Sequence, residues 1–401
     1  MRTSFYFRVL SAVIVTTVAA MPVDEPASAT EQEQWVVVPM PPGGQSIVLP
    51  VTLAGQPLKF FCTSLSVHFF DESLRPQLGR VLGVKRIVGA LAQDTPADVV
   101  KTPTLIVGDY ELRPMEGDIA PVVDLSALRQ ATEEEIRGVL GLPFLCGRLV
   151  QFDFDEGVVR LAHRQLNRDE LGTPWPLRLA SSKSLWVDNV LVGDRTESFE
   201  LALGNNRWIG VHHWLFKSLV QEEKVRMFAP DMYGKYRTYG PPVGESGLLT
   251  QIAWGGQNQN EVIIDKSDSN LLGLRFLSRF VITLDVDGGR IYLRPGKKAR
   301  ANRPDAIGCT GMTAEKRDRD FVVTEVRDNS SSAMAGVRVG DAVVSINGIP
   351  CRDMLRTEFA WRMDESRGSR VGLEIQRDGL PIRVSFDVPL TTPPELFLQE
   401  N

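Results

Sequence analysis

The feature that most constrains the fold is a long internal repeat. The stretch VLGLPFLCGRLVQFDFDEGVVRL superposes without a gap on LLGLRFLSRFVITLDVDGGRIYL, so that Leu140 falls on Leu272 and Leu161 on Leu293. Nine of the twenty-two positions between these ends are identical, and most of the others exchange one apolar residue for another. A spacing of 132 residues is far too long for a stacked-repeat protein. The sequence therefore predicts a duplicated lobe.

Each copy is preceded by a hairpin pattern. Residues 46–66 and 184–206 both show a strand, a turn with glycine and a second strand, with Val, Ile, Leu and Phe alternating against small or polar residues. A short apolar-periodic stretch follows each hairpin, FDESLRPQLG in the first half and VHHWLFKSLVQEE in the second, and predicts a brief helix. In the second helix we expect Trp214, Leu215 and Leu219 to be buried. Each lobe should therefore consist mainly of antiparallel strands.

Composition sets the class of protein. With 401 residues, of which 43% are hydrophobic, the chain suits two or three globular domains. The 45 basic and 50 acidic residues are interspersed without a basic block, so we expect no nucleic-acid partner. Proline-rich segments mark three predicted joints, at 39–44, 173–176 and 294–304. The joints delimit three predicted domains, which are a first lobe at 46–165, a second lobe at 184–298 and a C-terminal domain at 304–390.

The first residues have the pattern of a secretory signal. Arg2 and Arg8 precede an apolar run that ends at Ala20 and is too short to span a bilayer comfortably. We predict a signal peptide at 1–29, cleaved after Ala20 or Ala29, and an exported protein of the periplasm or cell envelope. An uncleaved anchor helix is the alternative. No later apolar stretch reaches spanning length, so we expect no stable membrane span in the mature chain.

Export would permit disulfides among the four cysteines, which are Cys62, Cys146, Cys309 and Cys351. If a bridge forms, Cys309 with Cys351 is the first candidate, because both lie in the C-terminal domain. Four cysteines in a chain of this length do not make a disulfide scaffold, and buried unpaired thiols are the favoured expectation.

The order of these patterns carries a resemblance to a known family. A strand, a glycine turn, a second strand and a later Leu-Gly-Leu-x-Phe-Leu before an Asp-containing strand resemble the lobe of an aspartic protease. Two such lobes, over about residues 46–296, are similar to the bilobal pepsin-like arrangement or to a tandem of bacterial retropepsin-like domains. The resemblance implies that each lobe contributes one aspartate to a pair that shares a proton and activates water for attack on a peptide carbonyl.

The two catalytic aspartates are missing from the positions where the resemblance expects them. These positions form two triplets, which here are the degenerate residues Cys62, Thr63, Ser64, Ala202, Leu203 and Gly204. In this match Cys62 corresponds to Ala202, and no Asp-Thr-Gly or Asp-Ser-Gly occurs anywhere in the chain. The nearest rival, Asp94 in DTPA, lies far past the hairpin, and its proline would prevent the close backbone approach that glycine permits. The resemblance therefore implies binding without cleavage.

Cys62 could act as a nucleophile only if a neighbouring base lowered the pKa of its thiol. His68 lies six residues further along the sequence, which is roughly 20 Å in an extended strand. More distant partners, such as His163 or His212, stay open. We favour a small buried residue in the space that an aspartate would otherwise fill.

Two other groups of polar residues are interpreted as structural. His212 and His213 are adjacent, so their side chains would point about 100° apart on a helix. No HExxH or CxxC accompanies them, and we predict no metal and no cofactor. The stretches FDFDEG and LDVDGG each place Asp-x-Asp before glycine at a strand end, a pattern typical of hairpin turns.

From about residue 308 the pattern changes. A strand pattern FVVTEV precedes AMAGVRVGDAVVSING, and a helical LRTEFAWRMDES and a final hairpin across RDG follow. These features resemble a PDZ domain, which implies a groove where a peptide adds as an extra strand and its terminal carboxylate meets a glycine-rich loop. We expect this loop around Gly311, Met312 and Thr313. The next stretch, TAEKRDRD, is more charged than a usual groove strand, so a domain that only packs within the chain is the alternative.

Together the observations predict a mainly β protein with two aspartic-protease-like lobes from an internal duplication and a small α+β PDZ domain. We expect an exported, non-catalytic protein that binds a C-terminus or an extended segment of a peptide or protein through the PDZ domain. The cleft between the lobes is a second candidate site. The alternatives are an active peptidase, through misregistered aspartates or the Cys62 thiol, and a scaffold that assembles through the PDZ domain.

Overall fold

The computed structural model describes residues 35–87, 95–162, 168, 170–229 and 244–398. The predicted signal peptide at 1–29 lies outside these residues, as do Asp94 and His163. The described part of the chain is mainly β, as the sequence predicts. None of the helices within it is long and apolar enough to cross a membrane.

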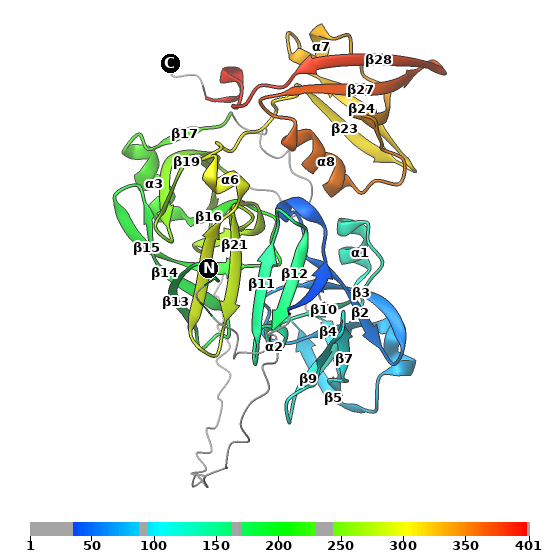
Figure 1. The fold of residues 1–401 in the computed structure, drawn as a ribbon, viewed down its shortest axis with the longest axis vertical. Coiled ribbons are helices and arrows are strands. Elements are labelled where there is room, and N and C mark those ends of the chain that lie inside the picture. Colours follow the sequence, from blue (N-terminus) through cyan, green and yellow to red (C-terminus); the bar gives the residue numbers. More distant parts are fainter. Residues whose placement is uncertain (1–34, 88–94, 163–167, 169, 230–243, 399–401) are drawn as a thin grey trace, which may run out of the picture. The chain divides into compact units, whose positions relative to one another are not determined.

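The first half of the chain forms a nine-stranded sheet, which we call lobe 1 (Figure 1). Its strand order is β5-β6-β9-β4-β10-β3-β2-β7-β8. The predicted hairpin joins β2 to β3 through a turn in which Ala54 and Gly55 take positive φ angles of 48° and 83°. The strands are β2 (Val48–Leu53), β3 (Gln56–Cys62), β4 (Phe69–Asp71), β5 (Val81–Ile87), β6 (Thr95–Lys101), β7 (Leu105–Val107), β8 (Tyr110–Leu112), β9 (Ile119–Val123) and β10 (Ile136–Leu140).

The second half, which we call lobe 2, repeats this arrangement in the order β14-β15-β20-β16-β19-β18-β17. In lobe 1, β3 runs parallel to β10, β10 antiparallel to β4, and β4 parallel to β9. In lobe 2, β15, β20, β16 and β19 follow each other with the same directions. The internal duplication is therefore present in the topology. The strands are β14 (Leu185–Val192), β15 (Arg195–Ala202), β16 (Ile209–His212), β17 (Val225–Met227), β18 (Ser246–Trp254), β19 (Gln257–Ser267) and β20 (Leu271–Gly273).

A six-stranded portion of sheet joins the two lobes in the order β1-β12-β11-β21-β22-β13. At its centre β11 pairs antiparallel with β21, and Gln151 lies opposite Thr283. These two residues are also equivalent in the repeat, so a local two-fold axis passes between them, as in a symmetric dimer interface. The Gln151 side-chain amide donates a 2.9 Å hydrogen bond to the Thr283 hydroxyl there. The strands are β1 (Val36–Pro39), β11 (Leu149–Asp153), β12 (Val158–Ala162), β13 (Thr173–Leu179), β21 (Phe280–Asp285) and β22 (Arg290–Pro295).

The two Asp-x-Asp patterns form hairpin turns, which confirms the prediction made from their glycines. The Asp153 carboxylate accepts the backbone N–H of Asp155 and Glu156 between β11 and β12. The Asp285 carboxylate accepts the N–H of Gly288 between β21 and β22. Such local bonds replace ladder bonds that the chain loses where it reverses direction.

Short helices connect the strands. The helix predicted after the second hairpin is α3, and its buried residues include Leu215 and Leu219, each worth about 1.5–3 kcal/mol of burial. The expectation for Trp214 is wrong, because its side chain is 48% exposed. The turn from Leu215 to Leu219 already fills the core face, so Trp214 points outward. The helices of the lobes are η1 (Pro42–Gly44), η2 (Glu72–Gln77), α1 (Ser126–Thr132), α2 (Leu142–Leu145), α3 (His213–Gln221), α5 (Leu274–Leu277) and α6 (Lys297–Arg300).

The proline-rich segment at 173–176 is part of a strand, although the sequence suggests a joint. Residues 173–176 of β13 pair with β22, and Leu177–Leu179 pair with β14. Because β13 changes its partner between Pro176 and Leu177, neither β22 nor β14 takes hydrogen bonds from the N–H groups of the whole strand. This change carries the chain from the joining sheet into lobe 2.

The C-terminal domain has a separate small sheet and its own apolar core (Figure 1). Its strand order is β23-β24-β25-β27-β28, with β26 paired to β25. After β28 the chain passes through η3 (Pro394–Leu396) and returns to β17 of lobe 2, where Phe397 bridges to Phe228. The elements are β23 (Met312–Arg317), β24 (Asp320–Val326), α7 (Ser331–Met334), β25 (Ala342–Ile346), β26 (Ile349–Pro350), α8 (Arg356–Glu365), β27 (Arg370–Arg377) and β28 (Leu380–Asp387).

Candidate functional site

The strand pairing corrects the match between the two triplets. In lobe 1, Cys62 pairs with Leu140 across the parallel strands β3 and β10. In lobe 2, the repeat partner of Leu140 is Leu272, and Leu272 pairs with Leu201. The structural counterpart of Cys62 is therefore Leu201, and the match of Cys62 to Ala202 is wrong by one residue.

The difference arises from the length of the loops after β3 and β15. The Leu142 N–H donates to the carbonyl of Leu65 in lobe 1, and the equivalent Leu274 N–H donates to the carbonyl of Asn205 in lobe 2. Leu65 lies three residues past the paired end of β3, whereas Asn205 lies four residues past the matching point of β15. The second loop thus holds one additional residue. An alignment that counts backward from the ends of these loops is therefore shifted by one residue in strands β3 and β15.

The two loops meet closely where the lobes join. The corrected register matches Cys62 with Leu201 and Thr63 with Ala202, and none of these four side chains carries a carboxylate. The Ser64 hydroxyl donates a 2.8 Å hydrogen bond to the carbonyl of Leu201. A Cβ added to Gly204 would lie 2.6 Å from Oγ1 of Thr63, closer than carbon and oxygen approach without a bond. The contacts leave no room for a side chain at Gly204. That the six triplet residues are degenerate catalytic positions stays a prediction.

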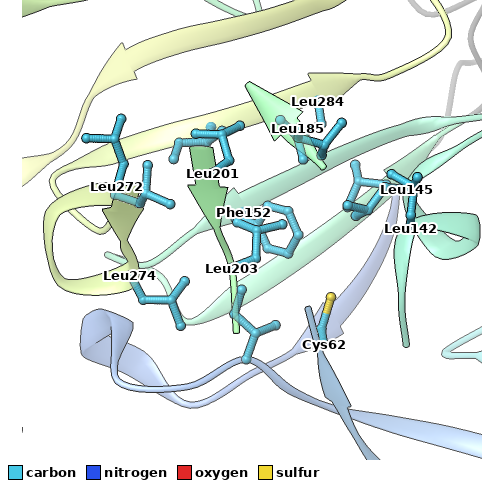
Figure 2. Packing of buried hydrophobic residues seen from close by; sticks show 14 of the residues in the cluster. Cys62, Leu142, Leu145, Phe152, Leu185, Leu201, Leu203, Leu272, Leu274 and Leu284 are labelled. Atoms are coloured by element: carbon cyan, nitrogen blue, oxygen red, sulfur yellow. The ribbon is translucent and has the colours of Figure 1, made fainter. Parts of the chain in front are cut away.

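Cys62 lies in the apolar core that runs through both lobes. Its side chain is fully buried, and its sulfur points into the same cluster as Leu203 and Leu142 (Figure 2). Burial raises the pKa of the Cys62 thiol far above its ordinary range, and a single backbone hydrogen bond at Thr63 offsets little of this shift. A thiol that stays protonated at neutral pH is a poor nucleophile. The Cys62 hydrolase alternative therefore loses its chemical basis.

His68 does not serve Cys62 as a base. Its Nδ1 accepts the backbone N–H of Gly141 at 3.0 Å, which holds the ring against the end of β10. Burial lowers the pKa of His68 to about 4, so the imidazole is neutral at physiological pH. The residue thus completes the backbone hydrogen bonding of lobe 1, a role that the sequence does not reveal.

All four cysteines lie in the described residues, and all are free thiols. The candidate bridge from Cys309 to Cys351 does not form. Burial is the main cause that raises the pKa of Cys146, Cys309 and Cys351 to about 11 in each case. None of them is therefore activated for nucleophilic attack.

His212 and His213 stand at the junction of β16 and α3, with ring centroids 4.0 Å apart. The backbone N–H of His212 is bound by the Asn270 side-chain oxygen. Within the described part of the chain, no group of three or more His, Cys, Asp or Glu side chains could hold a metal ion.

A groove in the C-terminal domain is the best-formed site. It lies between β23 and α8 and has a volume of about 550 Å³. Among the described strands, β23 stands at the edge of its sheet and pairs on one side only, with β24. Phe359 on α8 stacks on Phe321 of β24 at 4.1 Å and so anchors the helix over the sheet. An open strand edge beside a helix that turns apolar side chains such as Phe359 and Met363 toward it is the arrangement that accepts an extended chain.

The groove has two distinguishable ends. At one end the Lys316 ammonium on β23 donates to the carbonyl of Met354, just before α8 begins. At the other end the lining residues Gly308, Cys309 and Thr310 precede β23, and Asp364 and Arg367 stand at the C-terminal end of α8. Helix and strand thus run in opposite directions along the groove. A peptide added antiparallel to β23 would place its C-terminus at this second, loop end.

The predicted loop residues lie at this loop end. Met312 and Thr313 line the groove, whereas Gly311 is not among its lining residues. Gly311 has a φ of 73°, and a Cβ there would lie 2.0 Å from the Cβ of Ser330, so glycine is needed for packing. Sequence reasoning missed the lining residues Gly308, Cys309 and Thr310, although a second glycine three residues before Gly311 marks the same loop.

One wall of the groove comes from outside the C-terminal domain. Gln45, which follows η1, and Trp208 and Arg275 of lobe 2 line the same cavity. The Arg275 guanidinium lies 4.1 Å over the Trp208 ring and donates to the Gln45 side-chain oxygen at 3.1 Å. Trp208 and Gln45 thus hold the Arg275 guanidinium in one orientation at the wall of the groove. Sequence reasoning could not find it, because the three residues are distant from the C-terminal domain in the chain.

An ion pair between Arg367, which is buried, and Asp364, which is partly exposed, lies at the loop end of the groove. Burial alone would raise the pKa of Asp364, but the Arg367 guanidinium, with Lys298 and Arg303, lowers it to about 2. Arg367 pairs with Asp364 at 2.7 Å and also donates to the carbonyls of Pro304 and Leu390. Asp364 is therefore ionised. Through its pair with Arg367, it connects the end of α8 to the segments that enter and leave the domain.

Comparison with known proteins identifies this domain. A PDZ-domain family model matches residues 322–377. The C-terminal domain is a PDZ domain. The matched range holds β25 and α8 of the PDZ domain, whereas β23 and the loop before it precede the match.

Two solved structures share a distant likeness with this chain. No curated protein matches the sequence. The crystal structure of conglutin gamma, a basic 7S globulin from lupine seeds, is 9% identical, covers 66% of this chain and 96% of its own, and gives a TM-score of 0.38. Basic 7S globulin from soybean is also 9% identical, covers 65% of this chain and 95% of its own, and gives a TM-score of 0.39.

Proposed function

We propose that the protein binds the C-terminal segment of a peptide or protein in its PDZ groove and does not cleave it. The observation that carries the proposal is the open edge of β23 opposite α8, with a cavity of about 550 Å³ between them. The backbone N–H and C=O groups of such an edge can pair with an extended peptide. The cavity also has apolar lining from Met312, Phe359 and Met363 for the last side chain of the ligand.

The two lobes are proposed to be aspartic-protease-like lobes that have lost their catalytic pair. This part rests on the duplicated topology and on the absence of a carboxylate at the matched pairs Cys62–Leu201 and Thr63–Ala202. Proton sharing in such enzymes needs two carboxylates in close proximity. The lobes would then serve as a scaffold that supports the PDZ groove. Export to the periplasm or cell envelope, through the signal peptide at 1–29, belongs to the same proposal.

Peptide binding is tested with the mature chain and fluorescent peptides that end in a free carboxylate. We expect binding that weakens at least tenfold when the C-terminus is amidated, and that is lost in Ala360→Trp, which fills the groove from α8. Leu380→Trp is the matched control, because Leu380 is 67% exposed and lies on β28, away from the groove. Equal binding by native protein and Ala360→Trp would exclude the groove.

The loss of catalysis is tested separately with unfolded protein substrates at acidic and neutral pH. We expect no turnover above that of a blank. Turnover that survives Cys62→Ala would indicate an aspartate pair outside the matched positions, and turnover that is lost in this variant would restore the thiol mechanism. Either result contradicts the non-catalytic proposal and leaves the PDZ groove unaffected.

A further inference from the structure

A glutamate of lobe 1 contacts the PDZ groove at the end opposite the loop. Glu133 follows α1 with a φ of 57°, and its side chain is only 16% exposed. Its carboxylate accepts the Lys316 ammonium at 3.2 Å and the Arg356 backbone N–H at 3.0 Å. It also pairs with the Arg356 guanidinium at 2.5 Å. One carboxylate thus has three donors from two residues of the PDZ domain.

These donors belong to the two walls of the groove. Lys316 lies on the edge strand β23, and Arg356 is the first residue of α8 and lines the cavity. The residue before it, Leu355, offers no side-chain cap, so the first N–H groups of α8 depend on a partner from elsewhere. An anionic group is favoured there by the two cations and by the positive end of the helix dipole. The site is built for a carboxylate.

We propose, on the basis of the proposed peptide function, that this site is a subsite for an acidic side chain of the ligand. Glu133 is the internal carboxylate that occupies it in the free protein. Lys316 lies four residues after Met312, so an antiparallel peptide that ends opposite Met312 would reach Lys316 roughly four residues before its C-terminus. The ligand is therefore a C-terminal segment with Asp or Glu near that position.

Burial explains why a carboxylate must replace Glu133. The Lys316 side chain is 15% exposed, and an ammonium left unpaired at such a site loses both its ion pair and most of its water. An acidic peptide removes Glu133 and restores the same bonds, so the exchange is nearly balanced. A neutral peptide has nothing to offer these donors and must bind with Glu133 in place. Glu133 therefore competes with the acidic side chain of a ligand, whereas Lys316 and Arg356 favour that side chain over a neutral one.

The test compares two peptides with the same apolar C-terminus, one with Glu and one with Gln four residues upstream. Affinities are measured for the native mature chain, Glu133→Gln and Glu135→Gln. Glu135 is the matched control, because it lies two residues away, is 77% exposed and pairs with Arg137 instead. We expect Glu133→Gln to bind the acidic peptide roughly threefold to tenfold more tightly, the range of a few partly buried ion pairs. The neutral peptide and the control variant should show no change.

A second variant tests the subsite from the other side. Lys316→Gln added to Glu133→Gln should reduce the preference of that variant for the acidic peptide to within about twofold of unity, because a single neutral amide cannot replace the ammonium. An equal gain for both peptides in Glu133→Gln would overturn the inference, since it would show steric blocking without charge selection. An unchanged acidic-to-neutral ratio in all variants would also overturn it, while peptide binding itself stands. Absence of binding by every variant would instead defeat the proposed peptide function.

Discussion

His68 shows how one buried side chain sets the pH range of the fold. Its folded pKa of about 4 lies below the ordinary value of 6.5, so the unfolded chain binds more protons between these two values. The contribution of neutral His68 to the free energy of unfolding is fully present above pH 6.5, and it is lost as the pH decreases toward 4. We expect a loss of about 3 kcal/mol in the free energy of unfolding over this interval, at about 1.4 kcal/mol per pKa unit.

Urea denaturation at a series of pH values checks this expectation. In His68→Asn the slope between pH 6.5 and 4 should become shallower, because Asn can accept the Gly141 N–H without titrating. His213→Asn is the control, since His213 is exposed. A slope that is the same in native protein and His68→Asn would assign the pH dependence to other groups.

Gly204 is a second residue that the fold requires. Its added Cβ would meet Oγ1 of Thr63 at 2.6 Å, so Gly204→Ala must push the two loops apart. We expect a loss of about 1–3 kcal/mol in the free energy of unfolding, the usual effect of overpacking. Gly79→Ala is the matched control, because nothing lies within 4 Å of a Cβ there. Equal denaturation midpoints for the two variants would show that the lobe junction is loose.

At the scale of the elements, the C-terminal tail holds the PDZ domain to lobe 2. The Ala229 N–H donates to the carbonyl of Leu396, and the Leu398 N–H donates to Met227, so the tail extends the sheet beside β17. The ring centroids of Phe397 and Phe228 lie 5.2 Å apart. The Arg226 guanidinium lies over the Phe397 ring, 3.7 Å from its centroid. The segment that leaves the PDZ domain is thereby fixed to lobe 2.

Phe397→Ala should release this tail, because removal of a buried phenylalanine costs about 3–5 kcal/mol and the local pairing has few other contacts. We expect faster hydrogen exchange at the amides of Ala229 and Leu398 and faster proteolysis of the tail. Leu398→Ala is the matched control, because the side chain of Leu398 is 49% exposed. Unchanged exchange in Phe397→Ala would mean that the two backbone bonds hold the tail without the ring.

The same scale shows what sequence patterns can and cannot supply. The repeat and the Asp-x-Asp turns are visible in short stretches of the chain, and the sequence predicts them. The one-residue difference between the loops after β3 and β15 is not visible in the repeat, because it falls outside the ungapped stretch. The partners of Glu133 and Arg275 are contacts between segments far apart in the chain, and no pattern of spacing encodes them.

At the scale of the whole molecule, the lobes form part of the groove. Gln45, Trp208 and Arg275 line it near the loop end, and Glu133 occupies the opposite end. In the proposed function, the lobes therefore contribute charged side chains to both ends of the peptide groove.

Arg275→Met tests this role of the lobes. The substitution keeps much of the apolar stem over Trp208 but removes the guanidinium, which faces the groove end that would receive a terminal carboxylate. We expect peptides with a free C-terminus to bind roughly fivefold to thirtyfold more weakly, a loss of about 1–2 kcal/mol. Amidated peptides should bind as they do to the native protein, since they lack the charge that Arg275 would meet.

Arg290→Met is the control, because Arg290 begins β22 of the joining sheet, is exposed and does not line the groove. Isothermal titration of each variant with the carboxylate and amide forms of one peptide gives the ratio of the two affinities. This ratio shows whether Arg275 contacts the terminal carboxylate. An equal weakening of both forms would mean that Arg275 only supports the shape of the wall. An unchanged ratio and affinity would mean that the PDZ domain recognises the terminus without the lobes, and the lobes would then need a function of their own.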